Sequence, residues 1–150
     1  MDLFSARVAS DPDAPALRFK EGHVWRTLSW RDWEHTSRQL AAALIRHYKI
    51  APGDRVAMMA KTRVEWALMD LAIALTGAVS VPIYPTVMPA EVGLILGDSD
   101  CVLALVDTPE TAERLLAAHA GNGVSWTDDT DHVFGARRGV GTIDALLART

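Results

Sequence analysis

The stretch that decides the fold is Arg55–Val106, which reads RVAMMAKTRVEWALMDLAIALTGAVSVPIYPTVMPAEVGLILGDSDCVLALV. Three short apolar runs in it, Arg55–Ala60, Ala78–Ile83 and Cys101–Val106, alternate with two longer segments in which apolar residues recur at helical spacing. This alternation is typical of parallel strands joined by crossover helices, and uninterrupted apolar runs indicate strands covered on both faces. The sequence therefore predicts an α/β fold with a Rossmann-like parallel sheet, built on a three-strand βαβαβ core over residues 55–106.

Both expected crossover helices carry signals at their ends. Thr62 stands three residues before Glu65, which is the spacing of a capping box, and Gly77 suits the left-handed residue after a helix. The second helix has Pro89 in its first turn, and the Gly97–Asp100 turn is expected to end it.

The residues before this core predict an N-terminal hairpin between two flanking helices. Ala16–Phe19 and Val24–Leu28 are expected to form antiparallel strands joined by a glycine-containing turn. A short helix over residues 2–9 precedes them, and a long helix follows them. Ser29 is the expected N-cap of that long helix, with Asp32 completing a capping box.

The residues after the core carry a weaker pattern. A helix is expected to open at Thr108–Glu110, residues 121–141 are expected to be mostly loop, and Thr142–Arg149 has the spacing of a final short helix. The whole chain, residues 1–150, is expected to be a single domain or subdomain.

Composition narrows the class of protein. Hydrophobic residues make up 49% of the 150 residues and charged residues 23%, as in ordinary globular proteins. The net charge is -4 and no basic cluster is visible, which argues against nucleic-acid binding. Cys101 is the single cysteine, so a disulfide framework is excluded and a reducing compartment fits. No apolar run reaches the ~20 residues that span a bilayer. We expect a cytoplasmic protein, and peripheral contact with a membrane stays open.

Three segments together resemble a known family. They are Thr27–Trp30 (TLSW), Pro52–Ala57 (PGDRVA) and Gly77–Thr86 (GAVSVPIYPT). In this order and spacing they resemble the N-terminal part of the AMP-forming acyl-CoA synthetases, which belong to the adenylate-forming enzymes. The ending Ile83–Thr86 is most similar to the long-chain fatty acid branch, and the resemblance covers about residues 3–118.

The resemblance implies an activity and a set of cofactors. The family is a group of acid–thiol ligases that convert a fatty acid, ATP and CoA into acyl-CoA, AMP and pyrophosphate through an acyl-adenylate, with Mg²⁺. The chain would then be part of the N-terminal domain of the adenylate-forming fold. The family's phosphate loop ending in Pro-Lys-Gly and its catalytic lysine motif do not occur in these residues. We therefore assign no catalytic residue and no metal ligand, leave the cofactor-binding residues unknown, and expect the chain alone to be inactive.

The most promising candidate residues follow a predicted parallel strand. Tyr84, Pro85 and Thr86 stand at its carboxyl end, where open α/β sheets bind ligands. They form either a wall of the substrate cleft or a plain strand-ending turn. Trp66, on the first crossover helix, either lines an acyl channel or packs the helix on the sheet.

Two further patterns have a chemical and a structural interpretation. Gly135–Gly141 contains two arginines among glycines, as a phosphate-binding loop does, but it lacks the P-loop pattern, and a surface loop explains it better. Asp128, Asp129 and Asp131 are spaced unlike an EF-hand loop, so a solvated acidic turn is favoured over a cation site.

Two hypotheses about function stay open at this point. In the first, the chain is the N-terminal segment of an acyl-CoA synthetase and works with the remainder of the synthetase or a partner chain on a fatty acid or another carboxylate. In the second, it is a stand-alone, non-catalytic α/β binding or assembly module derived from that fold. An incomplete sheet leaves an open edge, so we also expect self-association through an exposed sheet edge.

Overall fold

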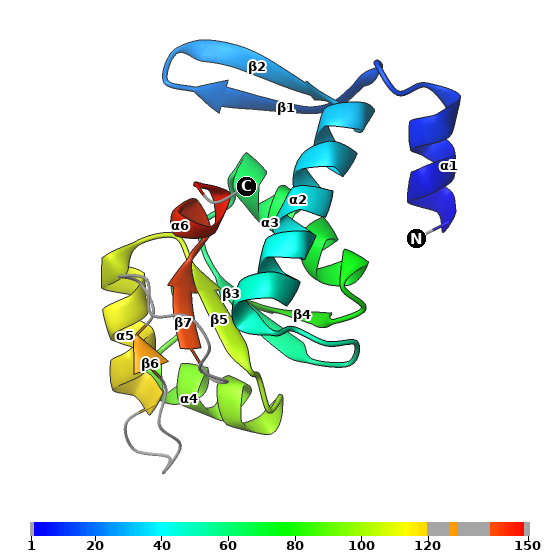
Figure 1. Ribbon diagram of the computed structural model, residues 1–150. Helices are drawn as coiled ribbons and strands as arrows, with labels where there is room; N and C mark the ends of the chain where they lie inside the picture. Colours follow the sequence, from blue (N-terminus) through cyan, green and yellow to red (C-terminus); the bar gives the residue numbers. More distant parts are fainter. Residues whose placement is uncertain (1, 120–126, 129–138, 149–150) are drawn as a thin grey trace.

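The computed structural model describes residues 2–119, 127–128 and 139–148 (Figure 1). In chain order the elements are α1 Asp2–Ser10, β1 Pro15–Glu21, β2 Val24–Ser29, α2 Trp30–Tyr48, β3 Arg55–Met59, α3 Val64–Leu75, β4 Val79–Ile83, α4 Pro89–Asp98, β5 Leu103–Val106, α5 Pro109–His119, β6 Thr127–Asp128, β7 Gly139–Thr142 and α6 Ile143–Leu147. No helix among the described residues is long and apolar enough to cross a membrane.

The larger sheet is parallel and contains the predicted core. Its strand order is β4-β3-β5-β7-β6, and each neighbouring pair runs parallel. Arg55 to Met59 of β3 pair with Val79 to Ile83 of β4, and Val56 to Met59 pair with Leu103 to Val106 of β5. The predicted βαβαβ unit over residues 55–106 is therefore confirmed, with each strand one or two residues shorter at one end than the apolar run.

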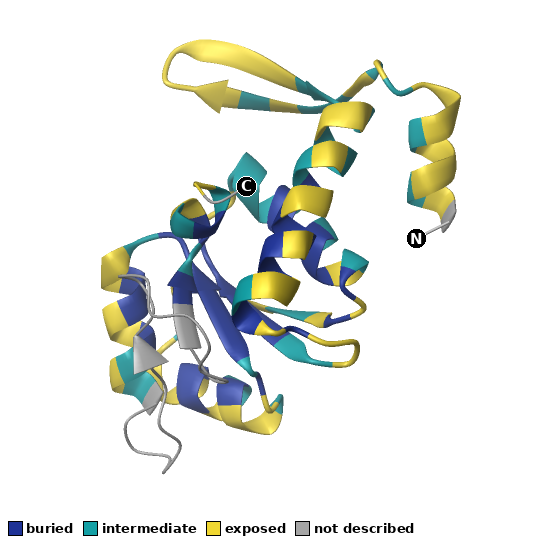
Figure 2. Ribbon diagram, viewed as in Figure 1, coloured by how far each residue is buried: buried dark blue, intermediate teal, exposed yellow. Residues whose placement is uncertain are grey.

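Helices cover both faces of this sheet. Alternate residues of a strand point to opposite faces. Met58 and Leu105 pack under α2, α3 and α6, whereas Met59 and Val106 pack under α4 and α5. All four side chains are fully buried (Figure 2). This two-sided burial explains why β3 and β5 read as continuous apolar runs.

The helix starts agree with the sequence in one case and differ in another. Ser29 is the N-cap of α2: its hydroxyl accepts from the Asp32 N–H at 3.1 Å, and the Asp32 carboxylate accepts from the Ser29 N–H at 3.4 Å. The capping box expected at Thr62 is wrong. Arg63 is the N-cap of α3, and its side chain makes no capping hydrogen bond, because a guanidinium has no acceptor. Its Nε donates to the Glu65 carboxylate instead.

The helix ends show where glycine is needed. Gly77 follows α3 with φ +80°, as predicted. Gly97, however, lies inside α4, and Asp100 adopts the left-handed conformation, φ 48°, in the turn before β5. Asp is one of the few non-glycine residues that tolerates this conformation, so the turn comes later than expected.

The sheet extends beyond the predicted strands. Gly139–Gly141, expected in a loop, belong to β7 and pair with Leu103–Leu105 of β5. A glycine-rich strand shows no apolar alternation, so the pattern was not visible in the sequence. At Gly141 an added Cβ would lie 2.5 Å from the Tyr48 hydroxyl oxygen, which explains the glycine. Most of the expected loop, residues 121–126 and 129–138, lies outside the described residues.

The predicted hairpin is confirmed as a separate two-stranded sheet. β1 and β2 pair antiparallel from Leu17↔Leu28 to Glu21↔Val24, and Gly22 makes the turn with φ +60°. Figure 1 shows the hairpin projecting from the start of α2, away from the parallel sheet. Figure 2 shows most of its residues exposed.

The first helix is held by an aromatic cluster. Phe4 of α1 packs edge-on against Trp30 and Trp33 of α2, with ring centroids 5.7 and 5.4 Å away, and the two tryptophans stack at 5.6 Å. The Arg7 guanidinium lies 5.4 Å from the Trp30 ring centroid. These two tryptophans therefore fasten α1 to α2, which is a packing role.

Candidate functional site

The carboxyl ends of the parallel strands bring several polar residues together. In open α/β sheets ligands bind at this edge. Here β3 leads into Lys61 and Arg63, β5 into Asp107, and β7 into α6, which carries Asp144. Arg63 and Asp144, for example, are 81 positions apart in the sequence. We therefore take this edge as the candidate site.

Asp107 is a buried charged residue at this edge. Its side chain accepts from the Lys61 backbone N–H at 3.0 Å and from the Thr111 hydroxyl at 2.9 Å. Burial by itself would raise the pKa of Asp107, but these hydrogen bonds outweigh it and the pKa lies below its usual value. A carboxylate held in this way ties the end of β5 to the loop after β3. The arrangement favours a structural role over proton transfer at neutral pH.

Arg63 is the central cation of the edge. Its Nε donates to Glu65 at 2.6 Å and its Nη2 donates to Asp144 at 3.0 Å, so it connects the start of α3 to α6. The hydrogen bond from Arg63 lowers the pKa of Glu65, although burial opposes the shift. The carboxylates of Glu65 and Asp144 thus both form ion pairs with the guanidinium. A phosphate would have to displace them before it could bind Arg63.

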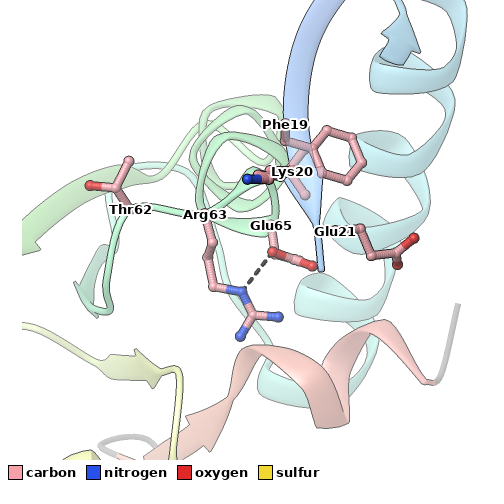
Figure 3. Close-up of a pocket in the computed structure, with 7 residues that line it drawn as sticks. Phe19, Lys20, Glu21, Thr62, Arg63 and Glu65 are labelled. Carbon is pink, nitrogen blue, oxygen red and sulfur yellow. Dashed lines mark hydrogen bonds and ion pairs between the residues drawn. The ribbon is translucent and has the colours of Figure 1, made fainter. Parts of the chain in front are cut away.

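A hollow opens beside this ion pair. It has a volume of about 440 Å³ and lies between the hairpin and the first turn of α3. Figure 3 shows Phe19, Lys20 and Glu21 of β1 on one side and Arg63 with Glu65 on the other. Its lining is part aromatic and part charged. This hollow could not be predicted from the sequence, because residues 19–21 and residues 62–65, which form its two walls, are far apart in the chain.

The residues predicted to form a cleft wall lie at the same edge but not in this hollow. Tyr84 follows β4 and is 79% exposed, and the Arg114 guanidinium donates to the Pro85 carbonyl at 2.9 Å. Thr86 is also exposed. Trp66 is half-buried against the core under α2 and α3, which is the opposite face of the sheet from α4. The structure does not join Trp66 to the Tyr84–Thr86 loop by any described contact, and the cleft role of the four residues stays a prediction.

The described residues do not fit the family's cofactors. Within residues 2–119, 127–128 and 139–148 no three His, Cys, Asp or Glu side chains are grouped to hold a metal ion. The end of the glycine-rich candidate, Gly139–Gly141, is paired inside the sheet and offers no loop for phosphate. Asp129 and Asp131 lie outside the described residues, so the acidic-turn interpretation stays a prediction. No chemical step through ATP, Mg²⁺ or CoA is derived from this chain alone.

The single cysteine is part of the core. Cys101 is a free thiol and is 1% exposed, among side chains that pack under α4 and α5. Burial raises its pKa to about 11. At neutral pH the side chain is therefore a thiol and not the nucleophilic thiolate, and its role is to pack in the core.

Comparison with known proteins gives the same family as the sequence motifs. A family model described as "AMP-binding enzyme" matches residues 4–136. The chain is 35% identical over 102 residues to the long-chain-fatty-acid–CoA ligase FadD15 of Mycobacterium bovis, covering 68% of this chain and 17% of that protein. It is 32% identical over 106 residues to the long-chain-fatty-acid–CoA ligase of Haemophilus influenzae, covering 71% and 18%.

A shorter relative also matches. The chain is 36% identical over 90 residues to Rv1549 of Mycobacterium tuberculosis, which is described as an uncharacterized protein, and the match covers 60% of this chain and 49% of that one.

Solved structures show the same fold. The O-succinylbenzoate coenzyme A synthetase MenE of Bacillus subtilis superposes with a TM-score of 0.75 at 18% identity, covering 98% of this chain and 34% of that one. An adenylation–PCP di-domain of Klebsiella oxytoca, NpsA-ThdA, gives 0.74 at 22% identity, covering 98% and 23%. The chain thus spans less than a fifth of the length of the long-chain ligases it matches. Since the family model matches most of its length, the chain belongs to the AMP-binding enzyme family.

Proposed function

We propose that this chain forms the N-terminal α/β part of an ATP-dependent acyl-CoA synthetase that activates a fatty acid as its acyl-adenylate and transfers it to CoA. The observation that carries the proposal is the 35% identity to a long-chain-fatty-acid–CoA ligase. The ending Ile83–Thr86, typical of the long-chain branch, supports the same substrate class.

In this proposal the chain is inactive by itself. Stabilising a charged phosphoryl transition state takes backbone donors, a cation and Mg²⁺, placed around the reacting phosphate. The family's phosphate loop and catalytic lysine motifs are absent from the 150 residues, and Arg63 is already paired with two carboxylates. The remainder of the synthetase, in the same chain or a partner chain, would supply those groups.

The contribution of this chain would be to the walls of the cleft. Beyond the carboxyl end of β4 come Tyr84, Pro85 and Thr86. The Tyr84 ring is exposed at this edge, where the remainder of the enzyme would cover it. Trp66 would act from the other face of the sheet, if the acyl channel passes along α3. The proposal predicts that the exposed surface of Tyr84 is lost when the remainder of the enzyme is present.

The test is ATP–pyrophosphate exchange with a mixture of fatty acids. Two proteins are compared: the purified chain, and a FadD15 chimera in which the 102 matched residues of this chain replace the corresponding residues of FadD15. We expect exchange above background only in the chimera. Exchange by the chain alone would contradict its inactivity. A folded chimera that adenylates no fatty acid would contradict the assignment to fatty acids.

A second candidate function has one observation in its favour. The match to Rv1549 covers 49% of that protein, so the same segment also occurs in a protein much shorter than the ligases. This favours a non-catalytic binding or assembly module derived from the fold. Stable binding of the chain to an intact synthetase, without replacing any part of it, would support this alternative over the first.

A further inference from the structure

The first turns of α5 connect the carboxyl ends of three strands. Thr111 and Arg114 stand three positions apart on this helix, so they are neighbours on its surface. The Thr111 hydroxyl donates to the Asp107 carboxylate after β5, and that carboxylate also accepts from the Lys61 N–H after β3. The Arg114 guanidinium donates to the Pro85 carbonyl, beyond the end of β4, at 2.9 Å. One helix thereby contacts the segments that follow β3, β4 and β5.

The helix α5 is a firm support for these contacts. Ala112 and Leu115 are 1% and 0% exposed, and they pack in the core that α4 and α5 cover on one face of the sheet (Figure 1). The Thr108 hydroxyl accepts from the Thr111 N–H at 3.2 Å, which satisfies a backbone donor at the start of the helix. A donor carried by a packed helix has a more fixed position than one carried by a loop.

The loop that Arg114 contacts is Tyr84–Thr86, the predicted wall of the substrate cleft. The Val87 N–H donates to the Tyr84 carbonyl at 3.0 Å, which is a bond within the loop region itself. The Tyr84 side chain is 79% exposed, so packing gives it little support. The bond from Arg114, in contrast, joins the loop to an element 29 positions further along the chain. This bond therefore sets where the loop stands relative to α5.

We propose that Arg114 is a positioning residue of the synthetase, whose guanidinium holds the Tyr84–Thr86 loop at the carboxyl edge of the sheet so that Tyr84 meets a substrate in a fixed place. The inference rests on the proposed function, because the loop has a substrate only in an intact enzyme. A wall that is ordered before the substrate binds has less freedom to lose on binding, which lowers KM and leaves the chemical step unchanged. Arg114 acts through the loop and touches no reacting group.

The first test measures the loop in the isolated chain by amide hydrogen exchange. Arg114→Met keeps an unbranched stem and removes the donors, whereas Arg114→Lys keeps a charged donor group. We expect the Val87 amide to exchange about tenfold faster in Arg114→Met than in the wild type, because local opening of the loop becomes easier. Arg114→Lys should restore most of the protection.

Two references make this measurement specific. The Gly53 amide donates to the Gly77 carbonyl at 2.9 Å, at the opposite edge of the sheet, and its exchange rate should stay within about twofold. The thermal midpoint of both variants should equal that of the wild type, because Arg114 is exposed. A substitution that loosened the whole fold would change both references.

The second test measures catalysis in a FadD15 chimera that carries residues 4–119 of this chain, which include the loop and α5. Rates of acyl-CoA formation give the KM of each substrate separately from kcat. We expect Arg114→Met to raise the KM of one substrate about fivefold and to leave kcat within about twofold, as a loss of uniform binding does. Arg114→Lys should recover most of the affinity. The control is Arg38→Ala, which removes an exposed arginine paired with Glu34 on α2 and should leave KM and kcat within about twofold.

Several results would overturn the proposal. An unchanged Val87 exchange rate in Arg114→Met would mean that the loop keeps its place without this bond. A fall in kcat and in the thermal midpoint with unchanged KM values would show a merely structural role, and a loss of kcat that Arg114→Lys does not relieve would make the guanidinium part of the chemistry. A wild-type chimera that forms no acyl-CoA would contradict the proposed function, and the Val87 exchange rates would still decide whether Arg114 holds the loop.

Discussion

The parallel sheet and the β1–β2 hairpin differ in where their stabilising contacts come from. β3 and β5 are buried on both faces and paired on both edges, by neighbours within the described chain. The hairpin has free edges and largely exposed faces. The described chain therefore supplies the contacts that bury β3 and β5, while it supplies few contacts to the hairpin. The two regions thus differ in how much of their packing the described residues provide.

The largest expected effect tests the parallel sheet. Leu105→Ala truncates a fully buried side chain in β5, and we expect it to lower the free energy of unfolding by about 2–5 kcal/mol, from lost burial and the cavity left behind. Urea denaturation of the isolated chain measures it. Leu94→Ala, at an exposed leucine of α4, is the control and should cost under about 0.5 kcal/mol. Equal effects would mean that the sheet is not a packed core in solution.

A smaller effect is expected at the edge of the sheet. Asp107→Ala leaves the Lys61 N–H and the Thr111 hydroxyl without their acceptor, at a cost of about 1–3 kcal/mol. Folding lowers the pKa of Asp107, so its contribution is full above its unfolded value of about 3.9 and is lost as the pH falls toward the folded pKa. Urea titrations at pH 7 and at about pH 3 test this. A difference between wild type and variant that grows toward acid pH would contradict the assignment, and Glu113→Ala, on the exposed side of α5, is the control.

The burial of each element explains which strands could be predicted from the sequence. The strands of the core were visible because burial on both faces requires continuous apolar residues, as in LALV of β5. β7 was not visible, because Gly141 is there to make room for Tyr48 and therefore shows no apolar pattern. Local signals such as the Ser29 cap were found, since both partners lie within one helical turn.

The candidate site was less predictable for a related reason. Asp107 takes its hydrogen bond from Lys61, 46 positions earlier, and Arg63 meets Asp144, 81 positions later. Each looks like an ordinary loop residue until the topology places them at one edge. The strand order could have suggested this, because the carboxyl ends of parallel strands meet at one edge, but β7 and α6 were needed to complete it. The hollow beside Phe19 depends on the placement of the hairpin, which no local pattern gives.

The junction between the two regions should show an intermediate effect. Ser29 ends β2 and caps α2, so one hydroxyl connects the hairpin to the helix that covers the sheet. Ser29→Ala removes the acceptor for the Asp32 N–H and should cost about 1 kcal/mol of unfolding free energy. Ser29→Asp, which keeps an acceptor at the N-cap, should recover most of it in the same urea titration. An unchanged midpoint in the alanine variant would mean that the cap is dispensable, and the two regions would then be less coupled than the hydrogen bonds imply.

The smallest effect on stability is expected in the hairpin. It tests whether the hairpin lacks the packing contacts that stabilise the parallel sheet. Trp25→Ala removes a large side chain, which in a core would cost about 3–5 kcal/mol. Here the ring is 61% exposed and lies 5.6 Å from the Arg18 guanidinium, so we expect less than about 1 kcal/mol in the isolated chain. Urea denaturation, followed by far-ultraviolet circular dichroism so that loss of the tryptophan does not alter the probe, measures it. A cost near that of Leu105→Ala would show that the hairpin is already covered in solution, by a second copy of the chain or by residues beyond the described ranges. Dilution separates these two, because only contact with a second copy weakens as the protein concentration falls.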